Sequence, residues 1–373
     1  MNPSESSYAI INTPSARIYC ESKNNDRFIP DTRHIKDEAL YGYAVRLLDE
    51  TAAGGYVRIL THYGLTGFID PSALKTVTAA EVLDYLKEKL KVTDAASLDV
   101  LSAPSADAQI LVTLTRGSLI RSLEEETIIL PEGRFALEDV LSGNVPGGKN
   151  YTGDTDRDSK TALLPPEGWA RVRLLDGEGY VPSHFLAQKY FTETYLFADL
   201  KDIPGNQAAF SFQAHLNHHF VGMELLFRQY LLEEAMKYTG TQYRSGGRSA
   251  SGIDSAGLIM TAYMRCGVTI SREPVFSEGW PLKEIGFEKD GSGLFSLSNL
   301  EDPEFIRPGD VLYFVTGKDG KKSAAMYIGG GHYIYSSDAP EQYGVVMNSL
   351  FPDAPDYRED LHRGLKTVAG IRI

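Results

Sequence analysis

Cysteine is scarce in this chain: its 373 residues include two, Cys20 and Cys266. Two distant cysteines without closely spaced histidine partners do not form a zinc site, so we predict neither a metal nor a cofactor. A disulfide between Cys20 and Cys266 would have to join two different predicted domains. We therefore interpret them as buried thiols that pack as small apolar groups.

Long hydrophobic runs are also absent. No segment approaches the roughly 20 apolar residues that span a bilayer, so we predict no membrane span. Residues 1–7 (MNPSESS) have neither the basic start nor the apolar stretch of a signal peptide. Two interpretations of its location stay open: a cytoplasmic protein, or the mature form of an exported protein whose signal has been removed.

Positive charge is in deficit, with 37 Lys and Arg against 50 Asp and Glu and a net charge of −13. This balance argues against a nucleic-acid partner, because phosphate contacts need clustered Lys and Arg. The length favours two or three domains. The 35 Gly and 18 Pro favour short strands joined by turns.

The N-terminal half contains an imperfect repeat. Residues 55–74 and 168–186 share an aromatic-x-Arg-Val/Ile strand, a turn, a Gly-aromatic-Val/Ile strand, and Pro-Ser before a short helical turn. Upstream, residues 39–48 and 112–120 each read as a strand pair broken at Gly. The pattern predicts two small β-barrels of the same kind, and it resembles the bacterial SH3-like module.

The resemblance places SH3-like domains at residues 8–76 and 96–190, which could also bind a protein partner. The segment between them, 77–95, carries helical spacing at 80–90 and is predicted to be a linker helix. Residues 124–168 read as a long inserted surface loop. A second linker covers 191–219; its histidines, His215, His218 and His219, are more consistent with a polar linker than with a metal site.

The C-terminal half changes character. Residues 222–236 form an amphipathic pattern that ends near Gly240, and a second helix is expected to run from Asp254 or Ser255 to Cys266. Strands are predicted at 310–314, 324–329 and 332–335. Two helices followed by antiparallel strands indicate an α+β domain over 220–373.

Four phrases follow the first of these helices in a distinctive order: 243–247 (YRSGG), 252–258 (GIDSAGL), 307–314 (RPGDVLYF) and 326–329 (MYIG). Residues 220–373 thereby resemble the NlpC-type peptidases, papain-like enzymes that cut γ-D-glutamyl to diamino-acid bonds in bacterial wall peptides. Two SH3-like domains ahead of this domain are also a known arrangement in the family. The expected fold is multidomain: two small SH3-like β-barrels followed by an α+β papain-like domain.

The resemblance implies three catalytic positions, and all three are replaced. The family cysteine that follows the Asp is Ser255 here, the family histidine is Ser323, and the third polar residue is Tyr335. Family members also tend to have Trp at the position of Ser245 and Ser at that of Ala256. A serine hydroxyl is a weak nucleophile until an adjacent base removes its proton, and Ser323 cannot be that base.

Two other ways of retaining catalytic activity have little support in the sequence. A serine-hydrolase elbow requires Gly two residues before the serine, where this chain has Ile253. His332 could replace the lost base, but it lies three residues from Tyr335 on one strand and should point to the opposite face.

A retained ligand pocket is the alternative use of this site. In the family, the Asp before the nucleophile helps to hold the free amino group of the substrate, and here that residue is Asp254. The alternative that Asp254 only caps the helix is equally compatible with the sequence. Tyr243 and Arg244 are candidates for the same cleft, as is Tyr63 in the turn of the first module.

Three functions follow from these observations. The first is an inactive homologue that binds peptidoglycan-derived peptides. The second is an active peptide hydrolase that uses Ser255 with an unrecognised base. The third is a structural or interaction protein whose cleft is filled by bulky side chains such as Tyr335 and Met326.

Overall fold

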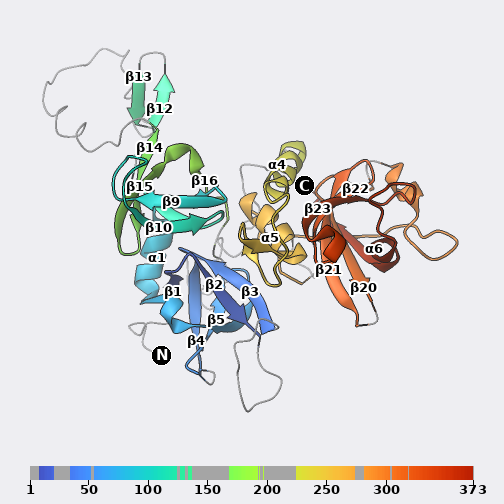
Figure 1. Cartoon of the computed structure of the whole chain (residues 1–373), viewed down its shortest axis with the longest axis horizontal. Coiled ribbons are helices and arrows are strands. Elements are labelled where there is room, and N and C mark those ends of the chain that lie inside the picture. Colours follow the sequence, from blue (N-terminus) through green and yellow to red (C-terminus); the bar gives the residue numbers. More distant parts are fainter. Residues whose placement is uncertain are drawn as a thin grey trace, which may run out of the picture.

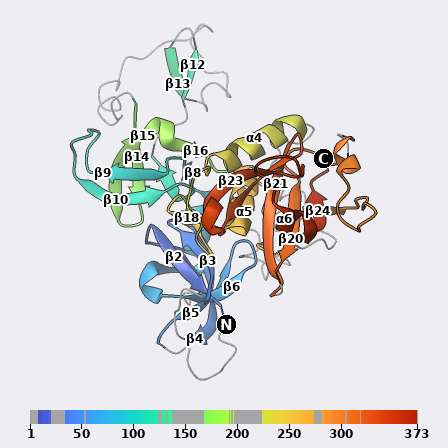
Figure 2. The ribbon, with the colours of Figure 1, turned by 45° about the vertical axis from the view of Figure 1, so that its right-hand side comes forward.

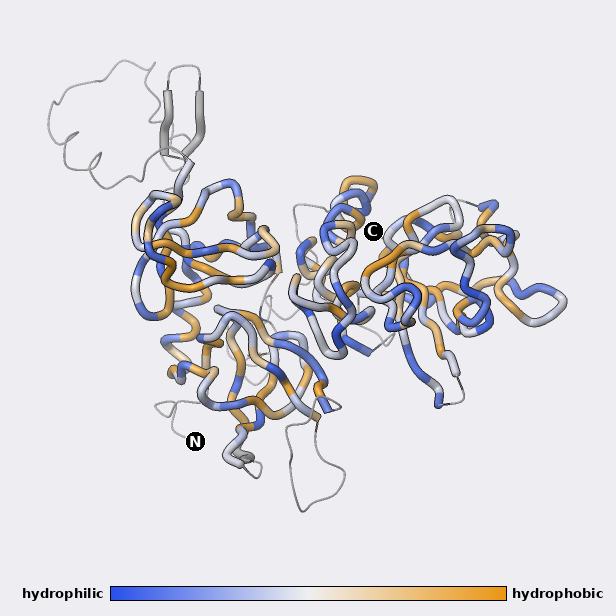
Figure 3. Tube along the Cα trace, in the orientation of Figure 1, coloured by the Kyte–Doolittle hydropathy of each residue, from blue (hydrophilic) through white to orange (hydrophobic). Residues whose placement is uncertain are grey.

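The chain folds into three connected parts, shown in Figure 1: two β-rich modules and a C-terminal domain of helices and one sheet. In the hydropathy view of Figure 3, the hydrophobic segments run along the strands of all three parts. The computed structural model describes residues 8–20, 34–51, 54–123, 127–130, 133–136, 168–191, 193, 196, 224–273, 281–302, 305–317 and 319–372.

The first module is a seven-stranded antiparallel sheet with the order β3-β2-β6-β5-β4-β1-β7. A 3₁₀ turn at Pro71–Ala73, capped by the side chain of Asp70, joins the last two strands as the Pro-Ser signal predicts. In chain order, the strands are β1 (Tyr8–Ile11), β2 (Ser15–Tyr19), β3 (Ile35–Leu40), β4 (Ala44–Thr51), β5 (Val57–Thr61), β6 (Thr66–Ile69) and β7 (Leu74–Val77).

The second module repeats this topology. Its sheet has the order β10-β9-β15-β14-β11-β8-β16, which is the order of the first module once the strands are renumbered along the chain. The internal repeat is therefore confirmed. The strands are β8 (Leu90–Thr93), β9 (Ser97–Leu101), β10 (Ile110–Thr115), β11 (Leu119–Ser122), β14 (Trp169–Leu174), β15 (Gly177–Pro182) and β16 (Leu186–Gln188).

The inserted segment of the second module contains a hairpin, β12 (Thr127–Leu130) paired with β13 (Gly133–Ala136). In Figures 1 and 2 this hairpin stands away from the rest of the module. The remainder of the predicted loop lies outside the described residues. So do the linker histidines at 215, 218 and 219.

Closed SH3-like barrels are not confirmed. The strand pairing leaves β3 and β7 at the two edges of the first sheet, and β10 and β16 at the edges of the second. The structure shows a β-rich N-terminal region made of two open sheets that have the same strand order. The domain boundaries given above stay a prediction.

The helix between the two modules is shorter than predicted. Helix α1 (Ala79–Lys87) begins with a capping box of Thr78 and Glu81 and ends where Glu88 becomes extended. Strand β8 then starts at Leu90, inside the stretch expected to be linker, and pairs with β11 and β16. Three of the four residues of β8 are buried, because β8 is an inner strand of the second sheet.

Equivalent turns of the two modules pack against each other. Gly42 and Gly117, the glycines that break the two predicted strand pairs, both have positive φ, at 82° and 95°. A side chain on Gly42 would meet the carbonyl oxygen of Leu119 at 2.3 Å, and one on Gly117 would meet Leu40 at 3.0 Å. Only glycine satisfies both the backbone conformation and this close approach.

The C-terminal domain has the predicted α+β arrangement, with a six-stranded sheet of order β19-β24-β20-β21-β22-β23 whose pairs are all antiparallel. Helices α4 (Glu224–Met236) and α5 (Ser255–Arg265) confirm the two helices expected from the sequence. The other elements are β17 (Arg248–Ser249), β18 (Gly252–Ile253), β19 (Lys283–Ile285), β20 (Val311–Thr316), β21 (Lys321–Gly329), β22 (His332–Ser337), β23 (Gly344–Ser349), α6 (Glu359–Gly364) and β24 (Leu365–Gly370).

Helix α5 is the centre of this domain. It contacts α4 on one side and β21 and β22 on the other, as the side view in Figure 2 shows. Nearly all of its side chains are buried, including Leu258, Ala262 and Cys266 at its C-cap, which share one core with Leu231 of α4. The thiols of Cys20 and Cys266 are both free, and Cys20 is half-buried rather than buried. In the described part of the chain, α4 and α5 are the longest helices, and none has the length and hydropathy needed to cross a membrane.

Two buried carboxylates join the first module to the C-terminal domain. Glu38 of β3 accepts hydrogen bonds from the Arg244 side chain at 2.5 Å and from the backbone N–H of Arg248 at 2.9 Å. Its neighbour Asp37 accepts one from Arg272 at 3.0 Å and one from the Tyr63 hydroxyl at 2.6 Å. Buried charges are tolerated only when paired and hydrogen-bonded in this way.

The second module is attached by a further charged contact. Asp94, between β8 and β9, pairs with Lys237 after α4 at 2.7 Å and with Arg265 of α5 at 3.6 Å. Arg116 lies over the ring of Tyr238, 5.4 Å from its centroid. Both modules therefore rest on the helices of the C-terminal domain through side chains that contact each other directly.

Replacing Glu38 tests the first of these joints. Glu38→Ala leaves a buried arginine N–H and the Arg244 guanidinium without their acceptor, so we expect a loss on the order of 3 kcal/mol in the free energy of unfolding. The control is Asp84→Ala, whose exposed pair with Lys87 should cost less than about 0.5 kcal/mol. Urea unfolding followed by circular dichroism measures both; equal losses would contradict the assignment.

A buried histidine lies in the same joint. His62 is stacked on Tyr43 and Phe191, with ring centroids 5.1 and 5.4 Å away, and its Nε2 lies 3.3 Å from the sulfur of Met264 in α5. Burial lowers the pKa of His62 well below 6.5, and the charges of Arg248 and Lys189 lower it further.

This lowered pKa makes the stability of the joint depend on pH. Because the unfolded chain binds the proton of His62 at a higher pH than the folded chain does, stability is complete above pH 6.5 and is lost as the pH falls below it. The loss should approach about 1.4 kcal/mol per pH unit relative to His62→Phe. Unfolding curves of the two proteins from about pH 8 to pH 5 measure the difference; parallel pH profiles would contradict a neutral buried His62.

Candidate functional site

The site is built at the first turn of α5. Asp254 is the N-cap: its backbone is extended, its side-chain Oδ1 accepts the N–H of Gly257 at 2.8 Å, and its carbonyl accepts the N–H of Leu258 at 2.9 Å. Ser255 follows as the first helical residue. The Asp-Ser phrase is thus a helix start that also points the Ser255 side chain toward the sheet.

Strand β21 lies against this helix end. The hydroxyl of Ser255 accepts a hydrogen bond from the N–H of Ala324 at 3.3 Å, so Ser323 lies beside it in the chain. On the neighbouring strand β22, Ser336 donates to the carbonyl of Ile253 at 2.7 Å. These two contacts fix the helix end against the sheet.

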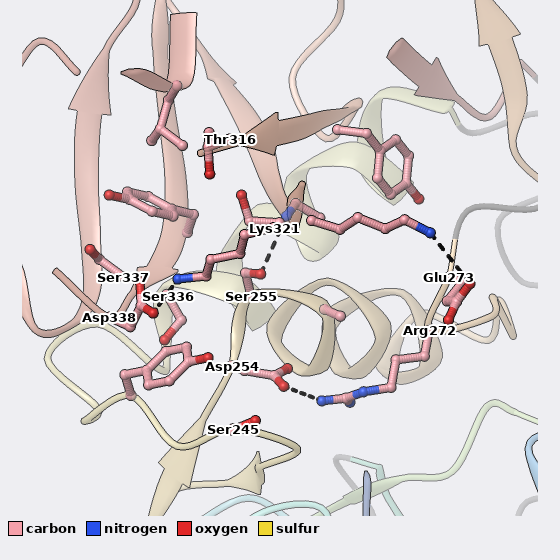
Figure 4. A pocket seen from close by; sticks show the side chains of 18 of the residues that line it. Ser245, Asp254, Ser255, Arg272, Glu273, Thr316, Lys321, Ser336, Ser337 and Asp338 are labelled. Atoms are coloured by element: carbon pink, nitrogen blue, oxygen red, sulfur yellow. Dashed lines mark hydrogen bonds and ion pairs between the residues drawn. The ribbon is translucent and has the colours of Figure 1, made fainter. Parts of the chain in front are cut away.

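A cavity of about 420 Å³ opens at this point and is shown in Figure 4. Ser255, Ser323 and Tyr335 all line it, so the structure brings the three positions implied by the family resemblance together. The wall also includes Lys36 and Leu65 of the first module. A residue of the first module therefore borders the same space as the start of α5.

The expectation of a filled cleft is wrong. Tyr335 forms part of the wall, where its hydroxyl accepts a hydrogen bond from Arg358 at 3.0 Å, and leaves the space in front of it empty. Met326 is fully buried in the core against α5 and does not line the cavity. The side chains on β21 and β22 that were expected to close the cleft instead support its walls.

No base stands beside the serine hydroxyl in the described part of the chain. Its hydrogen-bond partner is the backbone N–H of Ala324, and the residues that line the cavity include no histidine. His332 is exposed at the start of β22 and is not in the lining, and His362 bonds Tyr357 at 2.8 Å and the carbonyl of Phe295 at 2.9 Å. The hydroxyl oxygen of Ser323 is buried and, among the described residues, has no partner.

The tyrosines of the wall are also poor bases. Burial raises the pKa of Tyr335. Burial and the nearby carboxylates of Asp254 and Asp338 raise the pKa of Tyr243 to about 12. Both phenols therefore stay neutral at ordinary pH and offer hydrogen-bond donors to the cavity.

Both carboxylate oxygens of Asp254 have partners within the protein. Besides capping α5, its Oδ2 accepts the N–H of Gly246 at 2.7 Å and forms an ion pair with Arg272. Figure 4 shows the Arg272 guanidinium directed at this carboxylate. Arg272 also pairs with Asp37 of the first module at 3.0 Å, so one arginine connects the helix cap to the domain joint. The geometry gives Asp254 a structural role, and a substrate amine would have to displace Arg272 to reach it.

Two predicted cleft residues lie elsewhere. Tyr63 is buried in the joint, where its hydroxyl donates to Asp37 and the guanidinium of Arg248 lies 4.7 Å from its ring centroid. Arg244 bonds Glu38 and the hydroxyl of Ser249. Neither lines the cavity, because Asp37 and Glu38 of β3 hold both. No local pattern in the sequence marks these two carboxylates as buried. Tyr243 does line it.

Sequence reasoning missed the charged part of the wall. The lining includes five cationic side chains from four separate segments, and no local motif connects them: Lys36, Arg272, Lys321, Lys322 and Arg358. Two of them, Lys321 and Lys322, come just before a predicted strand and resemble ordinary solvent-facing lysines. Over the described residues, no cluster of His, Cys, Asp and Glu could hold a metal ion.

The match that decides the family lies in this part of the chain. Residues 240–352, which contain the capped serine and the strands of the cavity, match the NlpC/P60 family. This segment is an NlpC/P60 domain. The family is one of peptidoglycan hydrolases, and relatives of the chain are named as peptidases.

Two such relatives are informative. The chain is 25% identical to dipeptidyl-peptidase 6 of Lysinibacillus sphaericus over 365 residues, which are 97% of this chain and 99% of that protein. It is 26% identical over 130 residues to the bifunctional muramidase/DL-endopeptidase CwlT of Bacillus subtilis, which are 34% of each. The first match extends over both modules as well as the NlpC/P60 domain.

A solved structure shows the same fold along the whole chain. The NlpC/P60 family protein from Bacillus cereus superimposes with a TM-score of 0.54 at 17% identity, covering 97% of this chain and 98% of that one. The three-part arrangement is therefore shared beyond this sequence.

Restoring the two family side chains tests where the site positions lie. In a Cys20→Ser background, Ser255→Cys should be alkylated by iodoacetamide near pH 6 about tenfold faster when Ser323→His is added, because an adjacent imidazole stabilises the thiolate. Cys266 gives little background, since it is buried and its pKa is raised by burial. Ser323→His with Ser255 intact measures that background. Equal rates with and without the histidine would show that residue 323 does not face residue 255.

Proposed function

We propose that this protein binds peptidoglycan-derived peptides in the cavity at the start of α5 and does not hydrolyse them. One observation carries the proposal: the serine at the family nucleophile position contacts a backbone N–H and no base, beside a cavity that is empty and wide enough for a peptide. The family membership of residues 240–352 supports the class of ligand.

The absence of a base is decisive for the chemistry. A serine hydroxyl attacks a peptide only when a neighbouring group takes its proton. General-base help is typically worth about 10² to 10⁴ in rate, and here the more reactive thiol is also replaced. The hydroxyl of Ser255 is instead used as an acceptor that anchors α5 to β21.

The hydrolase alternative would need one of the lysines of the wall as base. Lys321 forms an ion pair with Asp338, as Figure 4 shows, and Lys322 lies 3.8 Å from Glu273. Each lysine nitrogen is thus directed at a carboxylate, whereas the hydroxyl of Ser255 bonds the backbone N–H of Ala324.

The cavity itself is suited to binding. It combines apolar walls from Leu65 and Tyr313 with convergent polar groups from Ser245, Tyr243 and Ser337. Ligand sites in proteins commonly have this composition, an apolar surface with a few fixed donors and acceptors.

A calorimetric titration with L-Ala-γ-D-Glu-diaminopimelate tests the proposal. We expect binding to the native protein, unchanged affinity in Ser255→Ala, and loss of binding in Ala256→Trp, whose indole would enter the cavity. The control is Ala106→Trp, at an exposed turn of the second module.

Chromatography of the same mixtures measures hydrolysis, and we expect none. Peptide cleavage that disappears in Ser255→Ala would contradict the proposal and establish the hydrolase alternative. Absence of binding to the native protein would contradict the other half of the proposal, that the cavity binds such peptides.

A further inference from the structure

The lining of the cavity carries nine charged side chains whose signs do not balance. Five are cationic and four are carboxylates, Asp254, Glu273, Asp338 and Asp360. The chain as a whole has the opposite bias, with a net charge of −13. A positive excess inside the cavity of an acidic protein indicates a ligand of negative charge.

Every carboxylate of the wall already has a cation. Asp254 pairs with Arg272, Asp338 with Lys321, Asp360 with Arg358 at 2.8 Å, and Glu273 with Lys322 at 3.8 Å. The Arg272 pair is the most buried, with side-chain exposures of 10% and 15%. A ligand ammonium that enters the cavity therefore meets carboxylates whose charge is already neutralised.

Lys36 is the cation in excess. It projects from β3 of the first module, and its ammonium donates to the backbone carbonyl of Thr66 at 3.0 Å. Within the described residues no carboxylate lies in ion-pair range of it. An ammonium has three donors, so Lys36 keeps donors for a ligand that reaches this side of the cavity.

Neutral donors that line the same cavity favour the same sign of charge. The Ser323 hydroxyl is buried without a partner in the described chain, and it can donate to an oxygen of the ligand. Ser255 and Ala256 present the first turn of α5, where the helix dipole favours negative charge. These donors and Lys36 thus border a cavity whose carboxylates are all paired.

We infer that the cavity selects a peptide by a free carboxylate, held between Lys36 and the start of α5, and not by a free amino terminus, because Arg272 occupies Asp254. The inference rests on the proposed function, since it names which end of the peptide the same cavity binds. Lys36 is then a specificity-determining residue supplied by the first module.

Two probes of opposite terminal charge test this selection by calorimetry. One is N-acetyl-L-Ala-D-isoglutaminyl-L-Lys with a free C-terminal carboxylate, and the other is L-Ala-D-isoglutaminyl-L-Lys amide with a free amino terminus; in both, the α-carboxyl of the γ-linked glutamate is blocked as an amide. We expect the native protein to bind the first at least about tenfold more tightly, and this preference to shrink as salt is raised.

Charge reversal then identifies the residue. Lys36→Glu should weaken binding of the acetylated acid about tenfold and improve binding of the amide. Lys87→Glu is the matched control: it makes the same change in net charge on an exposed face of α1, outside the cavity, and should leave both affinities unchanged. If Lys36→Glu fails to fold by circular dichroism, Lys36→Met removes the same ammonium without introducing a charge, and the preference for the acid should then fall toward equal affinity for the two probes.

The outcomes separate the two proposals. Preference for the amide, or equal affinity for both probes, would overturn the inference and leave peptide binding in place. A preference for the acid that survives the loss of the Lys36 ammonium in a folded variant would also overturn it. Binding of neither probe, nor of the diaminopimelate peptide above, would overturn the proposed function together with the inference.

Discussion

Two adjacent carboxylates, Asp37 and Glu38, hold this molecule together. They are buried on β3 of the first module, and each must be compensated by cations from the C-terminal domain. Arg244, Arg248 and Arg272 supply that compensation. Because a buried charge without a partner is costly, these pairs hold the first module, and the part of the cavity wall that it supplies, against the C-terminal domain.

This joint also determines the character of the cavity. Arg272 is shared by Asp37 of the joint and Asp254 of the helix cap, so the same guanidinium that fastens the module neutralises the carboxylate at the cavity floor. The serine next to the cap accepts a backbone hydrogen bond from β21. Asp254 and Ser255 thus make structural contacts at the edge of an open cavity, which is consistent with the ligand binding proposed above.

Much of this architecture could be predicted from the sequence, because it depends on local patterns. The repeat, the glycine turns, helices α4 and α5 and the three positions Ser255, Ser323 and Tyr335 follow from periodicity and from motifs within short segments. The placement of Tyr63 and Arg244 could not, since it depends on Asp37 and Glu38 being buried, and Arg244 lies 206 residues from Glu38 in the chain. The cationic wall was missed for the same reason: its members come from separate segments and meet only in the folded molecule.

The interlocked turns at Gly42 and Gly117 have a consequence for dissecting the protein. Leu119 covers the turn of the first module and Leu40 covers the turn of the second, so each module supplies part of the other's apolar surface. Removing the first module would uncover Leu119 and the arginines that pair with Asp37 and Glu38, and removing the second would uncover Leu40 and the partners of Asp94. The smallest fragment that keeps its interior shielded from water therefore includes both repeats and the domain that follows them.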